Sequence, residues 1–110
     1  MARTIGDFEQ LILFALIRLG SDASGVTIRA EIEARAGREI SPGALYTALD
    51  RLEKRGMVSS RLGDPTPERG GKRKRLYSVQ PAGERALARI YESIRLMASG
   101  MATRLRTIKD

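Results

Sequence analysis

The sequence predicts a mainly α fold with a small β-hairpin (α+β), because three helical patterns are followed by two strand patterns and a long fourth helical pattern. This order is that of a winged helix-turn-helix with an added C-terminal helix. The charge distribution agrees: residues 1–40 carry five basic and six acidic groups (net −1), whereas residues 41–80 carry nine and four (net +5). We therefore expect a winged helix-turn-helix DNA-binding domain over residues 1–80 and a C-terminal dimerisation helix over residues 81–110.

The amino-acid composition excludes several classes of function for this chain. The 110 residues include no His and no Cys, which excludes disulfides, thiol and imidazole nucleophiles and nearly every zinc site. We expect no catalytic residues, no metal site and no cofactor, and a cytoplasmic location. The longest apolar run, residues 11–17, is too short to cross a membrane. A net charge of +7 suggests either nucleic acid or an anionic membrane surface as the partner. Because the basic excess lies in residues 41–80 and not along one amphipathic helix, we expect nucleic acid and no membrane.

The first helix is expected to start at Asp7 as its N-cap and to stop at Gly20. Beyond its regular apolar stripe, Leu13, Phe14 and Ile17 make the opposite face apolar as well. A helix that is apolar all round needs cover on both sides. Either this second face lies in a dimer interface, which we prefer, or the helix is buried centrally in a monomer.

Residues that are typical of helix ends predict the limits of the second and third helices. The second is expected to begin between Ser21 and Ser24 and to end at Gly37. The third should use Ser41 as N-cap with Pro42 in its first turn, and should end before Gly56. The expected buried residues are Val26, Ile28, Ile32 and Ala36 in the second helix and Leu45, Leu49 and Leu52 in the third.

The third helix is the predicted recognition helix. Its small first turn allows close approach to DNA, so backbone amides and Ser41 can meet phosphate while Thr47 and Arg51 reach base edges. Two alternatives stay open. Ser41 could be only a cap, and Arg51 and Lys54 could form a solvated surface with neighbouring acids.

The predicted hairpin pairs residues 57–62 with residues 73–79. Five cations fall within seven residues around its tip, and such a density favours contact with phosphates, although strand alternation prevents all five from facing one duplex. A solvated loop without a ligand is the alternative. Tyr46 and Tyr77 could place a hydroxyl on a phosphate, but core packing is the more common role.

The last helical pattern starts at Pro81 and continues as a coiled-coil-like seam of about three heptads. Its apolar residues are Leu87, Ile90, Ile94, Met97, Met101, Leu105 and Ile108. Tyr91, Met97 and Met101 either line a cavity for a small hydrophobic effector at the dimer interface or fill the seam.

Several segments together resemble the PadR family of bacterial transcriptional regulators. The most specific is Ser41–Glu53 (SPGALYTALDRLE), followed by Gly56. Phe8–Leu13 (FEQLIL), Gly70–Arg75 (GGKRKR), and Tyr77 followed by Pro81–Gly83 (PAG) are also similar to family patterns. One position departs: the chain has Ser24 where the family commonly has an aromatic residue.

The resemblance implies a homodimer that binds double-stranded DNA at a palindromic operator. Members of the family are usually repressors, and those that have a small-molecule effector bind it at the dimer interface and are released by it. The expected DNA contacts are Ser41, Pro42, Gly43, Tyr46, Thr47, Arg51, Lys54, Arg69, Lys72, Arg73, Lys74 and Arg75. The expected dimer contacts are Leu13, Ile17, Leu87, Ile90, Ile94, Met97, Met101 and Leu105. The alternatives are a protein-interaction module and a nonspecific nucleic-acid binder with the same fold.

Overall fold

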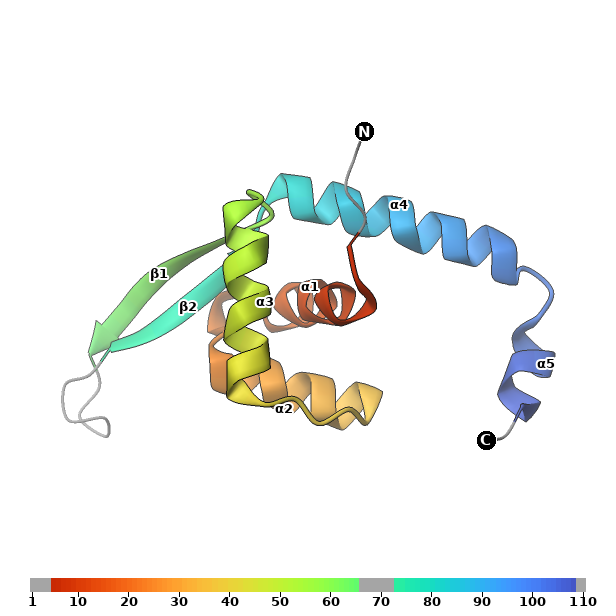
Figure 1. Ribbon diagram of the computed structural model, residues 1–110, viewed down its shortest axis with the longest axis horizontal. Coiled ribbons are helices and arrows are strands. Elements are labelled where there is room, and N and C mark those ends of the chain that lie inside the picture. Colours follow the sequence, from red (N-terminus) through yellow and green to blue (C-terminus); the bar gives the residue numbers. More distant parts are fainter. Residues whose placement is uncertain (1–4, 66–72, 109–110) are drawn as a thin grey trace.

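The computed structural model describes residues 5–65 and 73–108. Its elements are α1 (Asp7–Leu19), a 3-10 turn (Gly20–Asp22), α2 (Gly25–Ala36), α3 (Pro42–Lys54), β1 (Val58–Pro65), β2 (Arg73–Val79), α4 (Pro81–Ala98) and α5 (Ala102–Thr107). This order confirms the predicted fold class. The hairpin extends from one end of the molecule, while α4 runs to the opposite end and leads to α5 (Figure 1).

The helix α1 lies at the centre of the fold, where it contacts α2, α3, α4 and β2. Leu13 is completely buried in this core. The expectation that Leu13 belongs to a dimer interface is therefore wrong, because other elements of its own chain cover it. On the same helix, Phe14 and Ile17 keep 42% and 50% of their surface exposed. Part of the second apolar face thus remains without cover in a single chain.

The starts of α2 and α3 agree with the prediction, whereas the start of α1 does not. Ser24 caps α2 by accepting a hydrogen bond from the Thr27 N–H (3.3 Å), and Ser41 caps α3 by accepting one from the Ala44 N–H (3.1 Å). The predicted cap of α1 is one residue too late: Gly6 is the N-cap. Asp7 instead lies in the first turn of α1, and its carboxylate forms an ion pair with Arg38 (3.2 Å).

The predicted buried stripe of α2 is partly wrong. Ile28 and Ile32 are buried, but Val26 is 66% exposed and Ala36 is exposed in the last turn. Gly25 faces the core side at the start of this helix. Since each helical residue turns about 100° from the one before it, Val26 points away from that side.

The two strands of the hairpin pair with each other, and the hairpin is also hydrogen-bonded to the segment just before α2. Ser59 pairs with Ser78, and the register shifts between Leu62 and Pro65, so that β1 extends three residues beyond its predicted end. The Tyr77 N–H donates to the Ala23 carbonyl (2.8 Å). The strands are therefore fixed to the helical core at the base of the hairpin.

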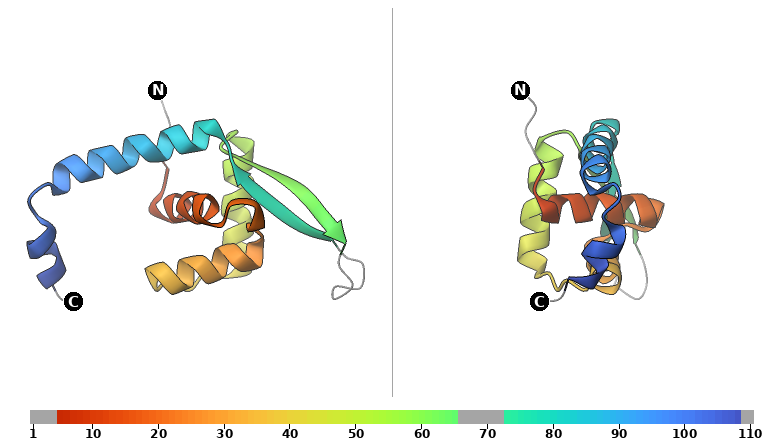
Figure 2. Two further views of the ribbon diagram at one scale, coloured as in Figure 1. Left: turned by 180° about the vertical axis from the view of Figure 1, so that it is seen from behind. Right: turned by 90° about the vertical axis from the view of Figure 1, so that its right-hand side faces the viewer.

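The predicted continuous C-terminal helix is interrupted. α4 ends at Ala98, Gly100 has a φ of 81°, and α5 begins at Ala102. A left-handed φ is available to glycine at little cost but ends an α-helix. The chain consequently turns at this point, and α5 leaves the axis of α4 (Figure 2). Within residues 5–65 and 73–108, no helix combines the length and apolar character needed to cross a bilayer.

Candidate nucleic-acid interface

The helix α3, predicted to be the recognition helix, has one buried and one exposed side. Leu45, Leu49 and Leu52 are buried as predicted. Pro42, Gly43 and Thr47 are exposed, so the small first turn is open to solvent. A helix with this arrangement can approach another molecule closely at its N-terminal end.

Tyr46 and Tyr77 have different environments. Tyr77 is buried in the core, whereas Tyr46 is 49% exposed. Burial raises the pKa of Tyr77 above its ordinary value of 10.0, and the nearby Tyr46 raises it further. The core role predicted for Tyr77 is therefore confirmed, while Tyr46 keeps half of its surface available beside the exposed side of α3.

The two cations near the end of α3 also differ. The Lys54 ammonium lies 2.9 Å from the Asp50 carboxylate, four residues earlier. In the part of the chain that the structure describes, Arg51 is exposed and forms no ion pair. Lys54 thus fits the alternative of a solvated surface on which basic and acidic side chains are paired. The guanidinium N–H groups of Arg51 remain available for hydrogen bonds to another molecule.

Two of the predicted wing cations, Arg73 and Arg75, make specific contacts. Arg73 donates from Nε to the Gly63 carbonyl (2.6 Å), which holds the irregular part of β1. Arg75 donates from Nη1 to the Ser60 hydroxyl (3.1 Å). Lys74 is half-buried. The other two predicted contacts, Arg69 and Lys72, lie outside the described residues.

The predicted dimer residues divide into two groups. Leu87 is buried, like Leu13, and is therefore withdrawn from the proposed interface, while Ile90 is half-buried against the core. The other five are exposed: Ile17, Ile94, Met97, Met101 and Leu105. Four of these five lie on α4 or at α5, where Ile94, Met97, Met101 and Leu105 line an apolar groove of about 370 Å³.

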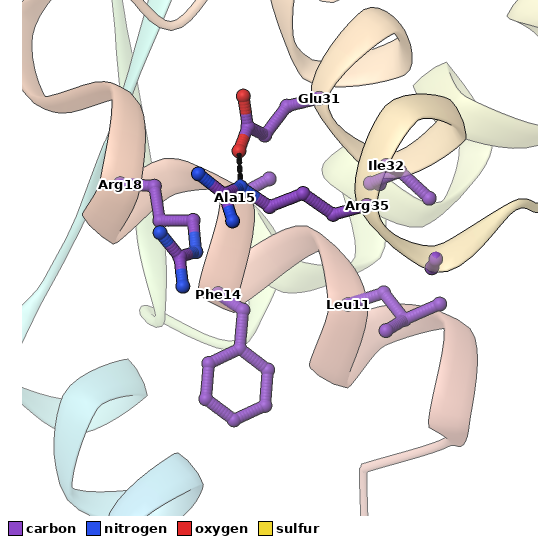
Figure 3. A pocket seen from close by; sticks show the side chains of 8 residues that line it. Leu11, Phe14, Ala15, Arg18, Glu31, Ile32 and Arg35 are labelled. Carbon is purple, nitrogen blue, oxygen red and sulfur yellow. Dashed lines mark hydrogen bonds and ion pairs between the residues drawn. The ribbon is translucent and has the colours of Figure 1, made fainter.

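A second cavity, of about 330 Å³, lies between α1 and α2 and was not predicted. Its walls include Ala15 and Ile32, and Arg18 and Arg35 approach it from the two helices (Figure 3). Glu31 forms an ion pair with Arg35 at this site. The exposed Phe14 is the sequence signal that could have indicated it, because this side chain also lines the cavity.

A model of the transcriptional regulator PadR-like family matches residues 12–89, which extend from α1 into α4. The chain belongs to this family. Membership places this PadR-like chain among transcriptional regulators rather than enzymes, and implies DNA binding.

Solved structures show the same PadR-like fold. A PadR family transcription regulator from Clostridium difficile has a TM-score of 0.73 and 22% identity, over 91% of this chain and 99% of that one. A transcriptional regulator from Clostridium thermocellum has a TM-score of 0.68 and 26% identity, over 92% of each chain. A PadR-like regulator from Bacillus cereus has a TM-score of 0.70 and 19% identity, over 93% of each chain.

A relative in Streptomyces fradiae, an uncharacterized 37.1 kDa protein in transposon TN4556, is 37% identical over 83 residues. The match covers 76% of this PadR-like chain but 21% of the relative. The matched region thus makes up about a fifth of that protein's length.

Proposed function

We propose that this PadR-like chain is a dimeric, sequence-specific repressor that binds an inverted-repeat operator. Membership of a family of transcriptional regulators supports the DNA-binding part of this proposal. The repressor role follows from the resemblance to the family. The inverted repeat follows from two-fold symmetry, since a symmetric dimer presents the same reading surface twice.

The observation that carries the proposal is the exposed side of α3, whose last turn is hydrogen-bonded to a basic hairpin. Thr47 and Arg51 are exposed opposite the buried leucines of α3. The hairpin emerges next to this helix, on the side of the molecule away from α5 (Figure 1). A helix in the major groove with a basic wing at the neighbouring phosphates reads bases and binds backbone at the same time.

The dimer contact is proposed on the exposed apolar surface of α4 and α5. Met97 is 78% exposed, and Ile94 and Leu105 are more than half exposed. Contiguous exposed apolar surface marks sites of association. We propose that the partner subunit binds here, that Ile17 of α1 is a further contact, and that a small apolar effector binds in the groove lined by Met97 and Met101.

The proposal is tested by titrating the chain against the DNA upstream of its own gene and against random duplex at the same salt concentration. The expected result is preferential binding to the upstream DNA and a footprint of two half-sites about 34 Å apart, one helical turn. A reporter gene downstream should be repressed. Equal affinity for both duplexes would indicate a nonspecific binder, and binding to neither would favour the protein-interaction alternative.

A further inference from the structure

A series of three hydrogen-bonded side chains connects the recognition helix to both strands of the hairpin. The Ser60 hydroxyl of β1 donates to Glu53 Oε2 in the last turn of α3, at 2.9 Å. The same hydroxyl accepts from Arg75 Nη1 of β2, at 3.1 Å. Arg75 was expected to be a DNA contact of the wing, and its guanidinium is held beside α3 by this hydrogen bond.

The strand register places these groups on one face. Ser60 is paired with Tyr77, and Leu62 is paired with Arg75. Since alternate residues of a strand share a face, Arg75 and Ser60 lie on the same face as Tyr77. This face borders a notch of about 280 Å³ between α3 and the hairpin, lined by Tyr46, Asp50, Glu53, Ser60, Arg75 and Tyr77.

The position of the notch gives it a role in a DNA complex. A helix in the major groove and a wing in the neighbouring minor groove lie on either side of one phosphate strand. The groups between α3 and the hairpin are therefore the ones that face this strand. Among the residues lining the notch, Arg75 is the single cation, beside the two carboxylates of Asp50 and Glu53.

The contacts already present reduce the repulsion that these carboxylates would exert on a phosphate. Asp50 is paired with Lys54, and Glu53 accepts the Ser60 hydroxyl. Arg75 uses one N–H on Ser60, and a guanidinium has five N–H donors in a fixed planar arrangement. Because the guanidinium is rigid, the one hydrogen bond to Ser60 also sets the direction of the remaining N–H donors.

We propose that Ser60 is a positioning residue that holds the Arg75 guanidinium at this notch, where it binds a backbone phosphate of the operator. The inference rests on the proposed function, because it assigns a DNA contact within that interface. It gives Arg75 a different role from Arg73, whose Nε donates a hydrogen bond to the Gly63 carbonyl of β1.

The test is Ser60→Ala, which removes the hydroxyl without changing any charge. A phosphate contact carries no sequence information, so affinity should fall about three- to tenfold for operator and random duplex alike, the range expected for weakening one charge-assisted hydrogen bond. The slope of log affinity against log salt should become shallower by up to about 0.9, the contribution of one complete phosphate contact. Ser60→Thr keeps the hydroxyl and should restore both quantities.

Ser59→Ala is the matched control. Ser59 is the neighbouring residue of the same strand, and its hydroxyl accepts a hydrogen bond from Gln80 Nε2 (2.7 Å). This variant also loses one side-chain hydrogen bond, but on the other face of the hairpin. It should keep the wild-type affinity and salt slope.

A double variant tests whether Ser60 acts through Arg75. In an Arg75→Ala background, Ser60→Ala should weaken DNA binding no further, since coupled residues are not additive. In the free protein, the NMR order parameter of the Arg75 Nε–H should fall in Ser60→Ala and stay unchanged in Ser59→Ala.

The outcomes separate this inference from the proposed function. If the wild type prefers its operator but Ser60→Ala binds like Ser59→Ala, Ser60 has no positioning role and the proposed function stands. Additive losses in the double variant, or a loss confined to the operator, would also overturn the inference. Absence of DNA binding by the wild type would overturn both.

Discussion

The Tyr46 hydroxyl of α3 lies against Gly25, the first residue of α2. A Cβ atom at Gly25 would be 2.2 Å from Tyr46 Oη and 2.8 Å from Cζ, distances at which one of the two groups must move. Gly25 is not among the glycines with positive φ. The present orientation of the tyrosine ring, and not the backbone conformation, thus leaves no room for a side chain at this position.

Replacing Gly25 with Ala should displace the Tyr46 ring. Since this ring is half exposed, it can swing outwards, so we expect a change in free energy of unfolding below about 1 kcal/mol but a loss of operator affinity similar to that of Tyr46→Ala. In the Tyr46→Ala background, Gly25→Ala should cost nothing further. An equal loss in both backgrounds, measured by operator titration, would place the effect in α2 itself.

Replacing Gly83 with Ala should destabilise the fold. A Cβ at Gly83 would lie 2.5 Å from the Met57 carbonyl oxygen, and backbone cannot move aside as a side chain can. We expect a loss of about 1–3 kcal/mol in denaturant unfolding. Gly43→Ala is the control, because it too follows a helix-initiating proline, but its Cβ would meet no atom within 4 Å. It should be neutral or stabilising by up to about 1 kcal/mol.

Arg51→Ala should weaken operator binding by about 1–3 kcal/mol and relax base selectivity, the loss expected when a side chain that reads a base edge is removed. Lys54→Ala should have a smaller effect, because Lys54 is already paired with Asp50. Affinities for the operator and for single-base variants of it would show the difference. A uniform loss across all sequences would make Arg51 a phosphate contact.

Met97→Asp should produce monomers, because a charge on an apolar interface is left without a partner. Operator affinity should fall as well, since two linked half-sites bind more strongly than one. Sedimentation velocity measures the first effect. Val26→Asp is the control: Val26 is also an exposed apolar residue, but it lies on α2, and this variant should remain dimeric. An intact dimer of Met97→Asp would remove this surface from the interface.

Stability should decline at high pH because of Tyr77. Its folded-state pKa is raised above 10.0, first by burial and second by Tyr46. The unfolded chain therefore releases this proton before the folded chain does, and the contribution to stability, complete below pH 10.0, is lost as pH rises above it. Denaturant unfolding of Tyr77→Phe should show a weaker decline above this pH. Identical curves for both proteins would contradict the assignment.

The parts of the fold that depend on local chemistry could be predicted from the sequence. Ser41, Pro42 and Gly37 mark helix ends through their own hydrogen-bonding and backbone preferences, and all three have the expected positions. The interruption of the last helix was missed. The apolar spacing continues across Gly100 as if the helix did, so periodicity alone carried no sign of the turn.

The candidate site was predictable at the level of its elements but not of its contacts. The hydrogen bond between Ser60 and Arg75 depends on strand register. Gly63 and Pro65 are typical of a strand irregularity, but they do not determine which residues of the two strands are paired. Similarly, an apolar second face predicts that Leu13 is covered, but not whether the cover comes from the same chain or from a partner.

The hydrogen bond from Tyr77 to the Ala23 carbonyl has a consequence for the thermodynamics of association. It ties the base of the hairpin to the start of α2, while Ser60 ties the same strands to α3. In the proposed complex, the described parts of the hairpin and α3 would therefore meet DNA with their relative orientation already fixed. Most of the conformational entropy of arranging these two elements is lost when the chain folds, and little of it opposes DNA binding.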